Sequence, residues 1–336
     1  MSLAATACGS GSDSPETKSS TPSASADKPR ELPPALTKQQ ALDAIDRYSQ
    51  VNNKANTDND RDLLDTVEDG PMYAMSVSEY KESEGLTPSE RKAYTPWAYD
   101  TQNTQLYIPR IANGQPRWFA AALSATPGKA PSRLAVFAEQ PQHKRWEMVS
   151  VADMYGPDLP TVALDADGYA TAVAANSNKD LAVGADRLRE GVLDNFATGG
   201  QNSGKKIFTE SKASSLQIKV HDETVTQYGS QGTSTFASAT NRYGDAYALK
   251  TTDGGALVFF SHTHTQTDAV ARSGLQLNPG KDDRAWLHDV PRSSIQYTFV
   301  CNDAATVPAK AAPSTLLAYT CARTDASGPP VNSASA

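Results

Sequence analysis

Apolar side chains near the start of the folded part recur at helical spacing. Thr37, with Gln40 three residues later, forms a capping box, in which each side chain bonds a backbone N–H that the first turn of a helix leaves free. The apolar residues that follow share one face of that helix: Ala41, Ile45 and Tyr48. The pattern predicts two further helices, over residues 62–68 and 72–84.

Beyond residue 100 the period of the apolar positions changes from helical to alternating, which is typical of strands. The turn pairs Asn113-Gly114 and Pro127-Gly128 separate the alternating runs. Because the connections are short, we expect an antiparallel meander with helices covering one face. The expected strands are residues 104–108, 117–123, 133–138 and 145–151.

The second half of the chain repeats this order. An apolar helical stripe follows Asp180 and ends at Gly199-Gly200. Its members are Leu181, Ala185, Leu188, Val192 and Phe196. Strands are expected at residues 216–220, 233–239, 246–251, 256–267, 294–301 and 315–322. The repeated order predicts an α+β protein with two tandem helix-plus-antiparallel-sheet lobes, residues 35–175 and 176–324.

Composition narrows the class of protein. The chain has 336 residues, 38% of them hydrophobic, and a net charge of −7. This negative charge argues against a surface that follows phosphate groups, so nucleic acid is excluded as a main partner. No apolar run reaches the roughly 18 residues that a membrane-spanning helix needs.

The first residues indicate a lipid anchor. Ala5-Thr6-Ala7-Cys8 is followed by Gly9 and Ser10. Small residues before a Cys, with Gly or Ser after it, resemble the lipobox of bacterial lipoproteins. The resemblance implies that residues 1–8 are the remnant of a signal peptide and that the Cys8 thiol carries a diacylglycerol. The protein would then be lipid-anchored on the extracytoplasmic face of the cell membrane. The alternative is an incidental Cys in a disordered tail.

Both ends of the chain are poor in apolar residues. Residues 9–34 are rich in Ser, Pro and Gly and bury too little surface to offset their ordering entropy, so we expect a disordered spacer. Residues 325–336 have a similar composition and predict a disordered tail.

The cysteine count agrees with an exported chain. There are three cysteines, and lipidation of Cys8 would leave Cys301 and Cys321 as a pair. These two lie in strand-like runs joined by a short loop, so we expect a disulfide between antiparallel neighbours. The alternative is two buried free thiols.

The order of elements resembles the cystatin-like or NTF2-like α+β roll, in which a curved antiparallel sheet wraps around a long helix. Together with the lipobox and spacer, it is similar to secreted two-lobed lipoproteins of actinobacteria that carry a domain of unknown function. The resemblance spans residues 36–324. It implies a location and a fold, and it brings no activity with it.

His262-Thr-His264 is the one constellation that suggests a metal ligand set. Residues two apart on a strand share a face, so both imidazoles would point the same way. Zinc or copper needs at least a third ligand, which His221, His288 or Asp289 would have to supply through the fold. The alternatives are the polar end of an amphipathic strand, or contact with a polar ligand.

Two other segments resemble a phosphate loop and a calcium loop, but each lacks a residue that such a loop requires. Residues 199–205 have the spacing of a phosphate loop, but Lys206 stands where Ser or Thr would hold magnesium, so we expect a polar helix-to-strand turn. Asp58, Asp60 and Asp62 are spaced like a calcium loop, but Leu63 stands where that loop needs Gly. A connection that caps the next helix explains the same carboxylates.

These patterns predict a membrane-anchored lipoprotein that acts as a binding or protein-interaction module of the cell envelope. Its partner would be an envelope protein, a cell-wall component or an apolar small molecule. The alternative is an envelope enzyme or metal-binding protein that uses His262 and His264. Catalysis has no support from a nucleophile elbow or a paired-acid motif, and we identify no cofactor motif.

Overall fold

The first helix begins where the capping box predicts. Helix α1 (Lys38–Asp58) starts after Thr37, whose hydroxyl accepts the Gln40 backbone N–H at 3.2 Å while the Gln40 side chain accepts the Thr37 N–H at 2.9 Å. The expected second helix is a single turn, α2 (Arg61–Leu64), and the third is α3 (Gly70–Gly85). Asp60 caps α2 by accepting the Leu63 N–H, as the sequence suggests.

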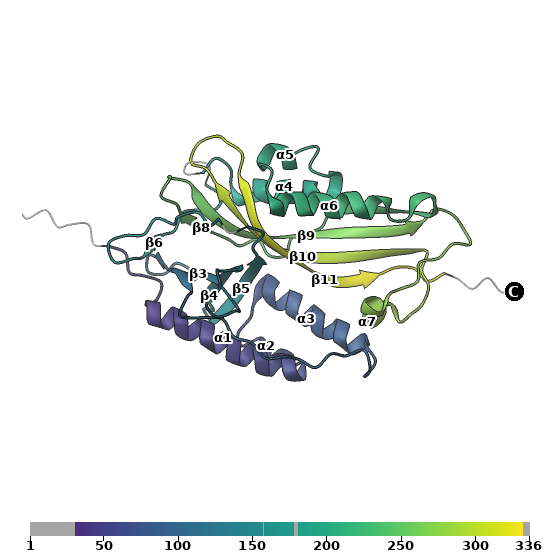
Figure 1. The fold of residues 1–336 in the computed structure, drawn as a ribbon, viewed down its shortest axis with the longest axis horizontal. Coiled ribbons are helices and arrows are strands. Elements are labelled where there is room, and N and C mark those ends of the chain that lie inside the picture. The colour runs from purple at the N-terminus through teal and green to yellow at the C-terminus, as the bar shows by residue number, and fades with distance from the viewer. Residues whose placement is uncertain (1–30, 157, 178–180, 332–336) are drawn as a thin grey trace, which may run out of the picture. The chain divides into compact units, whose positions relative to one another are not determined.

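The computed structural model describes residues 31–156, 158–177 and 181–331, and its ribbon is drawn in Figure 1. From Pro33 onward these residues belong to one compact unit. The predictions for Cys8, for residues 1–8 and for most of the expected spacer lie outside the described residues.

The first antiparallel sheet contains four strands in the order β1-β3-β4-β5. Its strands are β1 (Gln105–Tyr107), β3 (Trp118–Leu123), β4 (Arg133–Glu139) and β5 (Trp146–Asp153). Each lies within two residues of its expected run. A separate parallel pair is formed by β2 (Pro109–Arg110) and β6 (Ala170–Thr171).

The second antiparallel sheet has the order β11-β10-β9-β7, with β8 also paired to β9. Its strands are β7 (Gly232–Ser238), β8 (Ala246–Lys250), β9 (Ala256–Val270), β10 (Ser294–Val307) and β11 (Thr315–Ser327). On one side of β9, pairing with β8 ends at Phe260 and pairing with β7 begins at His264. The β7–β8 loop passes this interruption.

Helices cover both faces of the second sheet. Helices α4 (Ala185–Thr198) and α6 (Lys212–Thr226) pack on one face, and α3 packs on the other, as Figure 1 shows. Helix α4 ends at Gly199, whose φ of 67° is the left-handed conformation that glycine adopts without steric cost. The shorter helices are α5 (Gly204–Ile207), α7 (Arg284–Leu287), η1 (Gly229–Gln231) and η2 (Lys281–Asp283).

The structure corrects one expected strand. Residues 216–220 lie inside α6, which begins at a second capping box formed by Ser211 and Ser214. Ala213, Ser214 and Gln217 are its buried residues, at helical spacing. Residues 199–203 form the turn between α4 and α5, so the expected turn from a helix into a strand is also corrected.

The expected disordered ends are corrected where the structure describes them. Pro34 pairs with Arg110, so the last residues of the expected spacer are part of the fold. At the other end, β11 continues to Ser327, because its last residues pair with β10 and Ala326 is buried.

The α+β class with antiparallel sheets is confirmed. The division into lobes at residue 175 and the likeness to a cystatin or NTF2 roll stay predictions. Within the described residues, no helix has both the length and the apolar character needed to cross a membrane.

Candidate functional site

His262 and His264 share one face of β9, as their spacing predicts, and this face points toward α4. Both imidazoles are enclosed, with 1% and 3% of the residue exposed. The Phe196 ring of α4 stacks on His264 with 4.5 Å between centroids. Phe299 of β10 stacks on the same imidazole at 5.1 Å. The pair is therefore a core feature of the second sheet, rather than the exposed polar end of a strand.

Asp303 of β10 fixes the orientation of the first imidazole. Its Oδ2 lies 2.6 Å from His262 Nδ1, and its side chain is fully buried. Because a carboxylate only accepts hydrogen bonds, Nδ1 carries a proton, and the tautomer that fits this bond has its lone pair on Nε2. Gln217 of α6 also approaches Asp303, at 3.5 Å.

The second imidazole continues this hydrogen-bonded chain. His264 Nδ1 lies 3.2 Å from His262 Nε2, so the His264 Nδ1–H donates to the lone pair that Asp303 has left there. Burial lowers the pKa of His264 well below its ordinary value, and the unfavourable electrostatic interaction that a protonated His262 would have with a protonated His264 lowers it further. His264 is therefore neutral at physiological pH.

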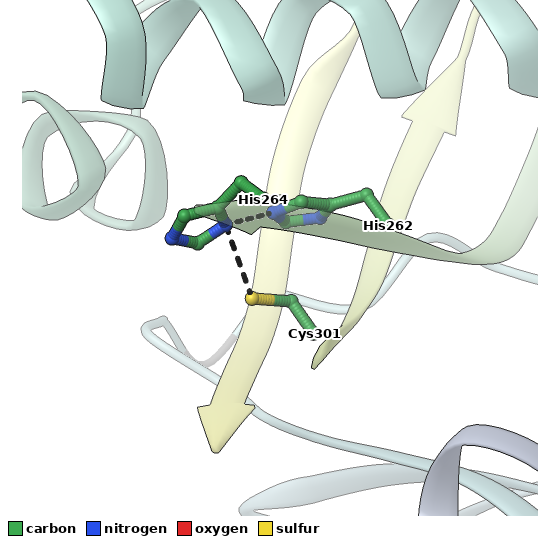
Figure 2. A group of neighbouring side chains, drawn as sticks. All are labelled: His262, His264 and Cys301. Atoms are coloured by element: carbon green, nitrogen blue, oxygen red, sulfur yellow. Dashed lines mark hydrogen bonds between the residues drawn. The ribbon is translucent and has the colours of Figure 1, made fainter. Parts of the chain in front are cut away.

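A disulfide completes the cluster, and it is the one that the sequence predicts. Cys301 of β10 and Cys321 of β11 face each other in the strand register and are bonded, with Cα atoms 4.1 Å apart. Cys301 is also the register partner of His262 on β9. Its sulfur lies 3.8 Å from His264 Nδ1, as Figure 2 shows.

The third metal-ligand side chain beside the histidine pair is Cys301, and not one of the third ligands that the sequence suggests. One ligand atom each from His262, His264 and Cys301 lie within 4.8 Å of one another, and this is the one such group among the described residues. His221 instead bonds the Phe196 carbonyl through Nδ1. His288 ends α7 at the surface, beside Asp289, so neither joins the cluster.

Asp303 is the member of this site that the sequence does not single out. Its signal is present, because Cys301 and Asp303 are two apart on a strand and therefore share a face. The register that places this face beside His262 spans about 40 residues, and no local pattern fixes it.

The two rejected motifs have structural roles. In the turn after α4, the backbone N–H groups of Asn202, Ser203 and Gly204 donate to the carboxylate of Asp194. An internal carboxylate thus occupies the position that a phosphate would need. In the other motif, the Asp60 carboxylate caps helix α2 by accepting the Leu63 N–H.

A cleft of about 390 Å³ lies between the first sheet and β9. Its walls are built from the start of α3, the residues just before β3, the end of β4, the middle of β5 and the β7–β8 loop, together with residues of β8 and β9. Val149, Tyr247 and Phe259 supply apolar surface, while Arg117 and Arg242 bring positive charge. Asp69, Glu139 and Asp245 bring negative charge. Apolar walls with a few charged groups are typical of small-ligand sites.

A protein family with a matching sequence is known for this chain. The family model described as a domain of unknown function, DUF8094, matches residues 32–328, nearly all of the described chain. The chain belongs to the DUF8094 family.

The curated relatives of this DUF8094 chain are named as uncharacterised lipoproteins. One, from Streptomyces coelicolor, is 66% identical over 331 residues and covers 98% of this chain and 92% of its own length. A second from that organism is 29% identical, covering 83% of this chain and 82% of its own length. One from Streptomyces avermitilis is 28% identical, with 84% and 82% covered. No solved structure matches the chain.

Proposed function

We propose that this DUF8094 protein is a lipoprotein anchored through Cys8 on the extracytoplasmic face of the membrane, where it acts as a binding module of the cell envelope. The lipobox-like residues before Cys8 support the anchor, and so does the lipoprotein name of the relative that is 66% identical. The disulfide between Cys301 and Cys321 supports an oxidising compartment.

Fatty-acid labelling tests the anchor. The chain is expressed behind a complete lipoprotein signal peptide, joined ahead of Ala5, in a Streptomyces host fed an alkyne fatty acid. The variants Cys8→Ala and Ser10→Ala are expressed in the same way. We expect the wild type and Ser10→Ala to carry the label in the membrane fraction, and Cys8→Ala to be unlabelled and released. Digestion of wild-type protein by protease added to cells without their wall tests the face. Unlabelled wild-type protein in the cytosol would overturn the proposal.

The cleft between the sheets carries the binding part of the proposal. A floor of buried apolar side chains beside charges of both signs suits a small envelope molecule with an apolar body and charged groups. The histidine pair does not suit an enzyme in the same way, because both imidazoles are enclosed in the core and do not reach a dissolved substrate. We therefore propose a binding protein rather than an envelope enzyme that uses His262 and His264.

Charge reversal at the rim tests the cleft. Arg242 lies in the β7–β8 loop and lines the cleft, whereas Arg272 is exposed outside it. The full chain with Cys8→Ala is screened against cell-wall fragments and amphiphilic envelope molecules by thermal shift. We expect a ligand that raises the melting temperature of the parent and of Arg272→Glu, and that fails to do so with Arg242→Glu. A ligand that acts equally on both variants would place binding elsewhere.

A further inference from the structure

Four side chains that bind soft metals lie on one face of the second sheet. His262 and His264 come from β9, and the bonded pair Cys301 and Cys321 comes from β10 and β11. Figure 2 shows that both imidazole rings and the Cys301 sulfur lie close together. All four side chains are thus held on a rigid antiparallel sheet and not on loops.

The spacing of the ligand atoms matches tetrahedral zinc. With Zn–N bonds of about 2.0 Å and Zn–S bonds of about 2.3 Å, neighbouring ligand atoms lie about 3.3 to 3.8 Å apart. The structure has His264 Nδ1 at 3.2 Å from His262 Nε2 and at 3.8 Å from Cys301 Sγ. These two separations lie close to the required range, and all three ligand atoms lie within 4.8 Å of one another. The two sulfurs are bonded to each other and must separate before both can bind the metal.

Asp303 supplies the outer support that metal-bound histidines use. A ligating imidazole commonly donates its other N–H to a carboxylate, which fixes the ring and raises the basicity of the ligand nitrogen. The 2.6 Å bond from His262 Nδ1 to Asp303 has this form and leaves Nε2 facing the cluster. Asp303 is fully buried, so its carboxylate is held in place by this bond and by the approach of Gln217.

These four side chains can bind a metal together only when the disulfide between Cys301 and Cys321 is reduced. A metal is bound by thiolate, and the sulfurs of a disulfide carry no such charge. Reduction gives two thiols, which become thiolates when Zn²⁺ binds, and Zn²⁺ with two thiolates and two neutral imidazoles has no net charge. A neutral complex suits this enclosed position, where an unbalanced charge would be costly.

We propose that the Cys301–Cys321 disulfide is a redox gate for a buried zinc site formed by His262, His264 and both cysteines. A dithiol reductant donates two electrons in two steps. One of its thiolates attacks a sulfur of the disulfide, which breaks the Cys301–Cys321 bond and releases one cysteine. Its second thiolate then attacks the reductant sulfur of this mixed disulfide, which releases the other cysteine and leaves the reductant as a cyclic disulfide. The two cysteine thiols lose their protons to solvent as Zn²⁺ binds. This proposal is independent of the cleft, so either can fail without the other.

Metal titration tests the gate. The full chain with Cys8→Ala, which lacks the third thiol, is reduced with a water-soluble phosphine, freed of it without oxygen, and titrated with Zn²⁺ or Co²⁺. The phosphine takes up the oxygen of one water as both thiols form. We expect one metal per reduced chain, with the visible bands of tetrahedral cobalt and thiolate-to-cobalt charge transfer. We expect neither in the oxidised chain.

Single substitutions identify the ligands. His264→Ala should abolish stoichiometric binding, while His143→Ala, at an exposed His in the β4–β5 turn, should bind as the parent does. Asp303→Asn should weaken zinc binding about 10- to 100-fold and keep the cobalt spectrum, as expected for an outer partner. Equal binding by His264→Ala and the parent would overturn the proposal.

Cys321→Ser covers the case in which reduction unfolds the chain. This variant leaves a free Cys301 thiol beside the two imidazoles without any reductant. We expect it to bind one Co²⁺ through a single thiolate, with a weaker charge-transfer band. A folded Cys321→Ser chain that takes up no metal would sink the idea, as would an oxidised parent that binds zinc as tightly as the reduced one.

Discussion

Glu68 is an acid enclosed without a cation. It lies between α2 and α3 and is fully buried. Its Oε1 accepts the Tyr48 hydroxyl at 2.9 Å and the Asn52 amide at 3.2 Å. Burial raises the pKa of Glu68 to about 8, although the hydrogen bonds from Ser76 and Tyr48 lower it in part. At neutral pH the folded chain therefore holds Glu68 mostly in its protonated form.

The free energy of unfolding should depend on pH through this residue. From the ordinary pKa of 4.5 up to about 8, the folded chain holds a proton that the unfolded chain has lost. Stability therefore falls as pH rises through this window, by on the order of a few kcal/mol. Glu68→Gln, which stays neutral, should flatten this slope. Urea unfolding of both chains across the window measures it.

The control for this prediction is Glu210→Gln, at an exposed position. It should leave the pH slope as in the wild type. Burial also raises the pKa of Glu147, to about 7, but that residue is present in all three chains and cancels in the comparison. A slope unchanged by Glu68→Gln would show that Glu68 is ionised in the folded chain.

At the scale of elements, Gly191 sets how closely α4 approaches its neighbours. It lies in the helix interior, where propensity alone favours Ala by about 1 kcal/mol. A Cβ at this position would lie 2.7 Å from the Phe208 ring and 3.1 Å from Ile207. The missing side chain thus lets the segment around α5 pack against α4.

Gly191→Ala should therefore destabilise the chain, against its helix propensity. Overpacking of a filled core costs about 1 to 3 kcal/mol, which exceeds the propensity gain. The midpoint of urea unfolding measures the effect. Gly156→Ala is the matched control, because a Cβ there would meet no atom within 4 Å and the residue is exposed. A Gly191→Ala chain more stable than the wild type would contradict the packing argument.

Local sequence patterns predicted some helices and strands correctly and others wrongly. The capping box at Thr37 and Gln40 depends only on residues within one helical turn, so the start of α1 could be predicted from the sequence. Residues 216–220 contain Ile218 and Val220, which favour strands, but the capping box at Ser211 and contacts from distant strands keep them helical. The His pair and the disulfide were predictable from spacing. Their meeting with Asp303 depends on register between β9 and β10, which only the fold supplies.

At the scale of the whole molecule, the two predicted lobes share one core. Phe119 and Phe137 of the first sheet belong to the same buried cluster as Leu257 and Phe259 of β9. Main-chain bonds also cross between the halves, as in the Tyr155 N–H that donates to the Leu317 carbonyl at 3.1 Å. This cluster therefore needs apolar side chains from both halves, although a second buried cluster is formed by residues 181–316 alone.

This shared core predicts that both halves unfold together. Phe259→Ala removes a ring from the common cluster and should cost about 3 to 5 kcal/mol. Because the ring touches both halves, amides of β4 and of β10 should lose protection against hydrogen exchange by equal amounts. Val220→Ala, at a partly exposed position of α6, should change neither. If β10 lost protection while β4 kept it, the halves would be separate folding units, and a binding cleft between them would open and close with their relative movement.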